Sequence, residues 1–211
     1  MSNLTDFFPS GGGGGLTPKF EEFNASGTFT PTQALIDAGG YIEVFLVAGG
    51  GGGMTNVTNG RGANGGEVQI KKMYLSSVSS CSVTIGAGGS KSTSPSDGGN
   101  SSFTGSSAGG TDLTCLGGYK GGSNSSSVAS QEGTSKSPNW GAFKDGEVNA
   151  SAGNGVFGYG AGGAYYALPT GAWSLNGESP SPNSGQGGVS SNNPSTSSSG
   201  APGYSLIKWY E

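Results

Sequence analysis

The chain contains no histidine, and this absence excludes several kinds of site at once. Catalysis by Ser-His-Asp or Cys-His groups is excluded, as is every zinc site that needs an imidazole ligand. Two cysteines, Cys81 and Cys115, are too few for a Cys₄ site or a disulfide framework. They are expected to be either two small buried side chains or one bridge. The sequence therefore predicts no metal, no cofactor and no enzyme activity.

Charged residues and long apolar runs are also scarce. Only 10% of the residues are charged, and the 9 basic residues are scattered singly apart from Lys71-Lys72. This distribution argues against nucleic-acid binding, which needs a basic patch. No apolar run reaches the roughly 18 residues of a membrane span, and residues 1–9 lack the features of a signal peptide. The chain is thus expected to be made in a cytoplasm and to leave it, if at all, inside a particle released by lysis.

Glycine is the most abundant feature, with 45 of 211 positions. The apolar segment Tyr41–Ala48 runs directly into five glycines, Gly49–Gly53, and glycine doublets recur from Gly65-Gly66 to Gly187-Gly188. Such a chain is either disordered or packed backbone against backbone, because side chains would hold the segments apart. The apolar residues are clustered and the net charge is only −4, so the packed state is favoured over a disordered chain.

Strand signals follow one another along the chain, and no segment has the pattern of an amphipathic helix. Tyr41–Ala48 is apolar on both faces except for Glu43, which predicts a central strand covered on two sides. Further strands are expected at 27–30, 67–75, 80–85, 101–104, 112–116 and 203–210, and one helical turn or a loop at 32–38. The predicted fold class is all-β, a small β-sandwich of the jelly-roll kind.

Residues 117–202 contain few aliphatic side chains, and a structureless loop of that length is unusual inside a compact domain. Extended chains of the polyproline II type solve this problem, since they have three residues per turn and glycine lets them lie side by side. Their backbone groups then pair with neighbouring chains. The sequence therefore predicts packed polyglycine II segments, together with long exposed loops within about 117–202.

The domain organisation is predicted from the first glycine run. Gly11–Gly15 separates Phe7-Phe8 from Phe20 and Phe23, as a flexible linker would. Residues 1–24 are accordingly expected to be an N-terminal arm that attaches to another protein through these four phenylalanines, or else a disordered tail. Residues 25–211 are expected to form the glycine-rich β domain.

Four sequence pieces, in this order, resemble the glycine-rich domain of bacteriophage tail fibres and tail-tip adhesins. They are Phe23–Thr30 (FNASGTFT), Tyr41–Gly53, Ser82–Gly89 (SVTIGAGG) followed by Gly99–Phe103 (GNSSF), and Gly200–Lys208 (GAPGYSLIK). The resemblance covers residues 23 to 210. It implies a small β-sandwich whose first and last strands pair, with glycine-rich segments packed beyond the sheets and no catalytic residues. Residues 117–202 depart from it, being richer in Ser, Asn, Pro and aromatics.

Aromatic side chains between Ser, Gly and Asn remain as candidate binding residues, because antibody loops use the same mixture. They are Trp140, Phe157, Tyr159, Tyr165, Tyr166 and Trp173. The alternative is that these rings fill a small core or an oligomer interface.

The main hypothesis is a tail-fibre or tail-tip protein that presents loops for binding to a host receptor. Its expected partners are other virion proteins and a host surface polysaccharide or outer-membrane protein, and it is expected to form a homotrimer within the virion after assembly in the host cytoplasm. The second hypothesis is a purely structural virion component, such as a collar or fibre-attachment protein. The third is a secreted glycine-rich matrix or ice-binding protein.

Overall fold

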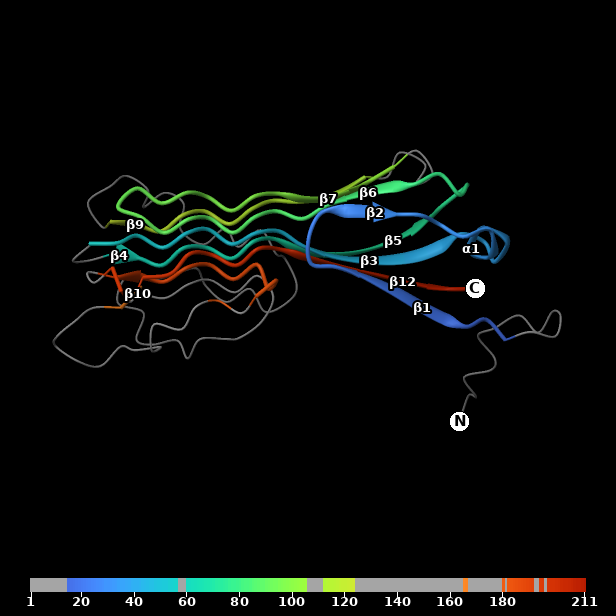
Figure 1. Ribbon diagram of the computed structural model, residues 1–211, viewed down its shortest axis with the longest axis horizontal. Coiled ribbons are helices and arrows are strands. Elements are labelled where there is room, and N and C mark those ends of the chain that lie inside the picture. Colours follow the sequence, from blue (N-terminus) through green and yellow to red (C-terminus); the bar gives the residue numbers. More distant parts are fainter. Residues whose placement is uncertain are drawn as a thin grey trace.

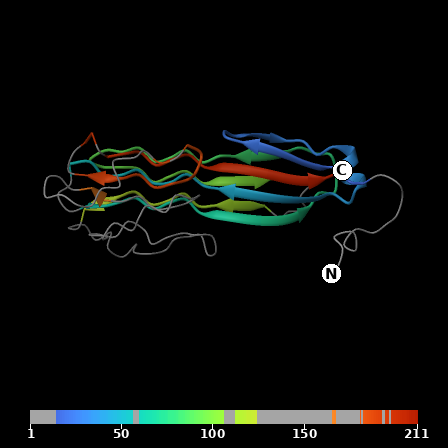
Figure 2. The same cartoon turned by 90° about the horizontal axis from the view of Figure 1, so that it is seen from below.

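The computed structural model describes residues 15–56, 60–105, 112–123, 165–166, 180, 182–191, 194–195 and 197–211. The molecule is elongated (Figure 1). Two β-sheets occupy one end, and extended glycine-rich segments run from them to the other end. We call these parts the sheet body and the glycine bundle. The C-terminus lies at the end of the sheet body that is farthest from the bundle (Figures 1 and 2).

The first sheet has four antiparallel strands in the order β1-β12-β3-β5. Their bounds are β1 Pro18–Phe23, β12 Tyr204–Tyr210, β3 Tyr41–Val47 and β5 Val68–Tyr74. Side chains alternate between the two faces of a strand. On β3, Ile42, Val44 and Leu46 are completely buried on the inner face, while Tyr41 and Phe45 lie on the outer face.

The second sheet is also antiparallel, in the order β2-β6-β7-β8. Its strands are β2 Gly27–Phe29, β6 Cys81–Thr84, β7 Ser101–Thr104 and β8 Leu113–Cys115. The all-β class predicted from the sequence is confirmed. The described part of the chain has a single helix, α1 Gln33–Asp37, at the expected helical turn. Within the described ranges, no helix has the length and apolar composition needed to cross a bilayer.

The hydrophobic core lies between the two sheets. Phe29 and Phe103, which are 1% and 0% exposed, lie with ring centroids 6.3 Å apart, and Trp209 of the first sheet contacts Phe29 edge-on at 5.3 Å. These rings join the two sheets, since aromatic pairs add to the energy of burial. Leu35 of α1 is fully buried in the same core. The helix begins at Thr32, whose hydroxyl accepts a hydrogen bond from the Leu35 N–H.

The two cysteines are buried thiols and do not form a disulfide. They lie on β6 and β8, which are separated by β7. Cys81 is opposite Phe29 of β2, and Cys115 is opposite Ser101 of β7. Burial, with the nearby negative charge of Glu67 as the next cause, raises the pKa of Cys115 to about 12. Because the thiolate is the reactive form, this side chain behaves as a small apolar residue.

Seven extended segments of the described chain form the glycine bundle. They are residues 48–53, 62–67, 86–90, 96–100, 116–121, 184–191 and 197–203. Figure 1 shows them as wavy traces that run side by side away from the sheets. Segment 48–53 follows β3 directly, and the other six surround it.

The N–H groups of the central segment 48–53 donate in a three-residue repeat. Residues 48 and 51 donate to segment 62–67, residues 49 and 52 to segment 96–100, and residues 50 and 53 to segment 197–203. All six N···O distances are 2.9–3.0 Å. Three residues per turn is the period of polyproline II, so each turn of the central segment presents one N–H to each of three neighbours.

The carbonyl groups of the central segment accept from the other three neighbours, again with a period of three. Residues 49 and 52 accept from segment 116–121, residue 50 from segment 86–90, and residue 51 from segment 184–191, which also donates to Met54 just beyond the central segment. The six neighbours also bond to one another in a closed ring, in the order 62–67, 116–121, 96–100, 86–90, 197–203, 184–191 and back to 62–67. The central segment is therefore enclosed by hydrogen-bonded backbone on all sides.

At positions 49–53 only glycine fits inside this ring. A Cβ atom on any residue of Gly49–Gly53 would lie 1.9–2.2 Å from a carbonyl oxygen of a neighbouring segment. In the ring, a Cβ on either residue of the doublets 88–89, 98–99, 117–118 and 187–188 would lie within 2.9 Å of backbone. By contrast, the residues that follow three of these doublets are exposed (Ser90 and Asn100) or partly exposed (Tyr119). In these turns two residues face neighbours and the third points outward, whereas Val189, which follows the fourth doublet, is buried.

Two expectations from the sequence differ from the structure. The sequence predicts an arm over residues 1–24, whereas residues 18–23 form β1, an edge strand of the first sheet. The last strand, β12, pairs with β1 and not with the strand expected at 27–30. That strand is β2, which ends at Phe29 and pairs with β6 in the second sheet. Within about 117–202 the sequence predicts both packed polyglycine II segments and exposed loops. The packed segments are confirmed at 117–121, 184–191 and 197–202, which belong to the bundle, and residues 124–164 and 167–179 lie outside the described residues.

Glu211, beyond the end of β12, connects three elements of the sheet body. Its carboxylate accepts hydrogen bonds from the Thr32 hydroxyl, which caps α1, and from Nε1 of Trp209 at 3.1 Å. The ammonium of Lys19, on β1, lies 3.8 Å from the same carboxylate. The hydrogen bond from Thr32 is the largest cause that lowers the pKa of Glu211.

This lowered pKa predicts a pH-dependent contribution to stability. A carboxyl group whose pKa is lowered by folding stabilises the fold above its unfolded-state pKa, and that contribution is lost as the pH falls through the folded-state pKa. We expect Glu211→Gln to lower the denaturant midpoint at pH 7, and the difference from the wild type to shrink between about pH 5 and pH 3. Chemical unfolding at several pH values measures this, with Glu22→Gln, an exposed carboxylate of β1, as the matched control. A difference that stays constant over this pH range would contradict the assignment.

Candidate functional site

The structure places part of the set of residues predicted to contact a receptor. Tyr165–Tyr166 form β10, which pairs in parallel with β11, Ser190–Ser191. This pair lies at the end of the glycine bundle that is far from the sheets, which we call the distal end (Figure 1). The other four predicted residues, Trp140, Phe157, Tyr159 and Trp173, lie outside the described residues.

Backbone contacts fix the described residues at the distal end. Strand β4, Gly60–Arg61, pairs with β9, Gly122–Ser123. Just beyond the central segment, Met54 and Thr55 bridge to residues 92 and 191 of two neighbouring segments. The ammonium of Lys91 donates to the carbonyls of residues 194 and 197, at 3.3 and 2.8 Å. Segments that are far apart in the sequence are therefore held together where they turn.

The phenylalanines predicted for attachment to other proteins have different positions. Phe23 is 7% exposed and belongs to the core, so its ring stabilises the fold and offers no docking surface. Phe20 is 69% exposed on β1. Phe7 and Phe8 lie outside the described residues. Of the two that the structure describes, only Phe20 is therefore accessible to a partner.

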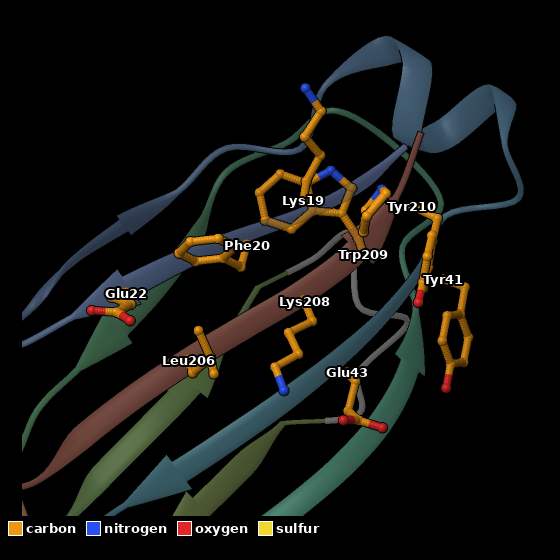
Figure 3. Close-up of a pocket in the computed structure, with 10 residues that line it drawn as sticks. Lys19, Phe20, Glu22, Tyr41, Glu43, Leu206, Lys208, Trp209 and Tyr210 are labelled. Carbon is orange, nitrogen blue, oxygen red and sulfur yellow. The ribbon is translucent and has the colours of Figure 1, made fainter. Parts of the chain in front are cut away.

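Phe20 borders a groove of about 580 Å³ on the outer face of the first sheet (Figure 3). The groove runs over β12, with Phe20 of β1 on one side and Tyr41 of β3 on the other (Figure 3). Leu206 and Lys208 of β12 lie between them. The sequence predicts that β3 is covered on both faces, and it therefore misses this site. The structure covers the inner face of β3 along its length. On the outer face, Val47 is buried with Val68 and Tyr204, while Tyr41 and Glu43 remain partly exposed.

Exposed apolar side chains extend beyond the groove across the same face. We define the outer sheet face by the residues Phe20, Glu22, Tyr41, Glu43, Ile70, Lys72, Tyr74, Leu206, Lys208 and Tyr210. Tyr74, Tyr210 and Ile70 are 67%, 46% and 43% exposed. The rings of Tyr41 and Tyr74 contact edge-to-face, with centroids 5.4 Å apart. Four of the large exposed apolar side chains thus gather on one sheet face.

Charged side chains of both signs lie among these apolar residues. Lys208, Glu43 and Lys72 are direct cross-strand neighbours on β12, β3 and β5, and Glu22 lies on β1. The face therefore carries two positive and two negative side chains, although the whole chain has a net charge of −4. Exposed aromatic rings are enriched at surfaces that bind other proteins, where charged residues lie mainly at the rim. Within the described ranges, no group of three or more His, Cys, Asp or Glu side chains is placed to hold a metal ion.

Comparison with known families adds one finding. The family model of the glycine-rich domain matches residues 24–210. The chain belongs to this family. In this glycine-rich domain the matched range includes the glycine bundle and every strand except β1, which precedes it. No curated protein gives a significant match to the chain.

Proposed function

We propose that this glycine-rich domain is a binding module at the tip of a bacteriophage tail fibre. The observation that carries the proposal is the enclosed glycine bundle, which extends from the sheet body and ends at the distal end beside Tyr165 and Tyr166. Gly49–Gly53 bring no side chains to the centre of the bundle, and the central segment is hydrogen-bonded to six neighbouring segments, so the bundle is a rigid support. Rigid support of variable loops is the arrangement that binding proteins commonly use.

The composition of residues 124–179 supports a binding role. Tyr and Trp among Ser, Gly and Asn supply contact area at a low cost in conformational entropy. A host surface polysaccharide or an outer-membrane protein is the proposed receptor. Each contact can be weak, because a phage presents several fibres and linked sites raise the overall affinity by 10²–10⁴.

The opposite end of the molecule is the proposed point of attachment. The C-terminus and the start of β1 lie together there, since the backbone of Thr17 bonds to Glu211 in both directions. Attachment at this end, through the N-terminal segment that contains Phe7 and Phe8, would leave the distal end free to meet the host. The proposed partners are other virion proteins, and the proposed location is the virion, assembled in the host cytoplasm.

Particles that carry substituted protein test this function. Alanine at Tyr165, Tyr166 and Trp173 together should lower the rate of adsorption to host cells by at least about tenfold, because interface aromatics of this kind each contribute more than about 1 kcal/mol. The matched control is Tyr119→Ala, a partly exposed tyrosine on a ring segment of the bundle.

The two functional hypotheses differ in the yield of particles. Normal assembly with lost adsorption supports receptor binding. If particles of the triple variant fail to assemble, the purely structural role is favoured, and if they assemble and adsorb normally, the receptor-binding role is refuted.

A further inference from the structure

We infer that the outer sheet face is the interface between two copies of this chain, which pack face to face about a two-fold axis. This inference does not depend on the proposed receptor-binding function. It rests on the exposed aromatic area, the arrangement of charges and the groove.

The exposed area of this face is large for a monomer. An aromatic side chain has roughly 150–250 Å² of surface, so Phe20, Tyr74 and Tyr210, at 69%, 67% and 46% exposure, leave about 350 Å² of ring surface in water. Patches of roughly 300–600 Å² are the largest found on typical monomers, and they commonly mark binding sites. A standard interface buries about 800 Å² on each partner. Three rings therefore supply nearly half of one side, and the surrounding charged and aliphatic side chains supply the rest.

The charges of the face suit a second copy better than a partner with a strong charge of one sign. In a two-fold interface the same patch lies on both sides, so the patch must be complementary to itself. The row Lys208–Glu43–Lys72 meets this condition, because a copy turned by 180° can place its Glu43 opposite a lysine of the first. The face is neutral while the chain carries −4, and two copies therefore repel each other least when they approach through it.

The shape of the face fits the packing of one sheet on another. Stacked sheets lie about 10 Å apart and interdigitate their side chains. The groove of about 580 Å³ beside Phe20 and Tyr41 gives an aromatic ring of the second copy a place to enter. Phe20 of the second copy can fill the groove of the first copy, and Phe20 of the first copy can fill the groove of the second, as two-fold symmetry requires. Phe20 then belongs to the interface between copies rather than to an attachment site.

Analytical ultracentrifugation of the full chain at about 1–100 µM, the range in which interfaces of this size associate, tests the inference. The expected species has twice the mass of the 20.6 kDa chain. Phe20→Glu combined with Tyr74→Glu should give a monomer with an unchanged circular dichroism spectrum. The matched control is Val78→Glu, which places the same charge at an exposed apolar residue (45%) outside the face and should remain a dimer. If the double variant does not fold, Tyr74→Ala, which only shortens an exposed side chain, serves in its place and should raise the dimer dissociation constant.

A charge exchange provides a second, independent readout. Glu43→Lys places three lysines in one row, and it should raise the dissociation constant by at least about tenfold. Adding Lys208→Glu and Lys72→Glu to this variant gives the row Glu–Lys–Glu, in which the signs alternate again, and should recover most of the affinity. A chain that is monomeric at 100 µM, a species with three times the chain mass, or a dimer that is unaffected by the substitutions on this face would each overturn the inference.

Discussion

Gly51→Ala is expected to destabilise the protein by at least about 3 kcal/mol, at the upper end of the cost of overpacking. The new Cβ atom would lie 2.1 Å from the carbonyl oxygen of Tyr119. This oxygen belongs to a neighbouring backbone that is itself hydrogen-bonded, so it cannot move aside as a flexible side chain can. Any shift of Gly51 also breaks its bonds to Asn64 and Gly188, both on other segments. Denaturant unfolding followed by circular dichroism measures the change.

The matched control is Gly15→Ala, just before β1. A Cβ atom at Gly15 has no atom within 4 Å, so the substitution should be neutral, or stabilising by up to about 1 kcal/mol through the reduced entropy of the unfolded chain. Equal effects at Gly15 and Gly51 would show that the loss of glycine flexibility, and not the packing of segment 48–53, determines the result.

Amide hydrogen exchange should be slowest in the central segment. The N–H groups of Gly49–Gly53 are all hydrogen-bonded to enclosing segments, and these residues are buried. They can exchange only when the bundle opens as a whole, and global opening costs about 5–15 kcal/mol in typical domains. Native-state exchange followed by NMR should therefore show these amides slowed by at least about a thousandfold relative to an unfolded chain.

The comparison within the same molecule is the amide of Gly39, which bonds to Ile36 in the exposed turn after α1. It should exchange much faster, because local fraying of one turn is enough to release it. Exchange of Gly49–Gly53 within minutes at neutral pH would mean that the bundle opens easily, and it would remove the rigid support on which the proposed function depends.

The strands could be predicted from the sequence because their signals are local. The prediction at 101–104 coincides with β7, and those at 41–48, 67–75 and 203–210 end within one residue of β3, β5 and β12. The helical turn at 32–38 is α1 with its flanking residues. Strand β1 was missed because PKFEEF has no clear alternation, and only its pairing with β12 makes it a strand.

The spacing of the glycines indicates which segment is central and which segments form the ring. A run of five marks the central segment, where every residue faces a neighbour, and the doublets mark the ring, where two residues of three do. The exact partners could not be predicted, because each segment bonds to others more than 30 residues away, such as Gly50 to Ala201. The outer sheet face cannot be predicted, for a different reason. Apolar residues on both faces of a strand indicate that both faces are covered, but the sequence does not show whether the covering residues belong to the same chain or to another.

The arrangement of the ring has a consequence for the order of folding. Segment 48–53 is synthesised early, yet two of its six N–H groups find their acceptors only in residues 197–203, and β3 gains its neighbour β12 only from residues 204–210. Contacts of such long sequence separation slow folding, since the loop must close before the contact forms. Segment 48–53 therefore cannot complete its hydrogen bonds until residues 197–203 are in place. Removal of residues 197–211 would take away one of the six neighbours of the central segment together with β12, and it should therefore destabilise the domain.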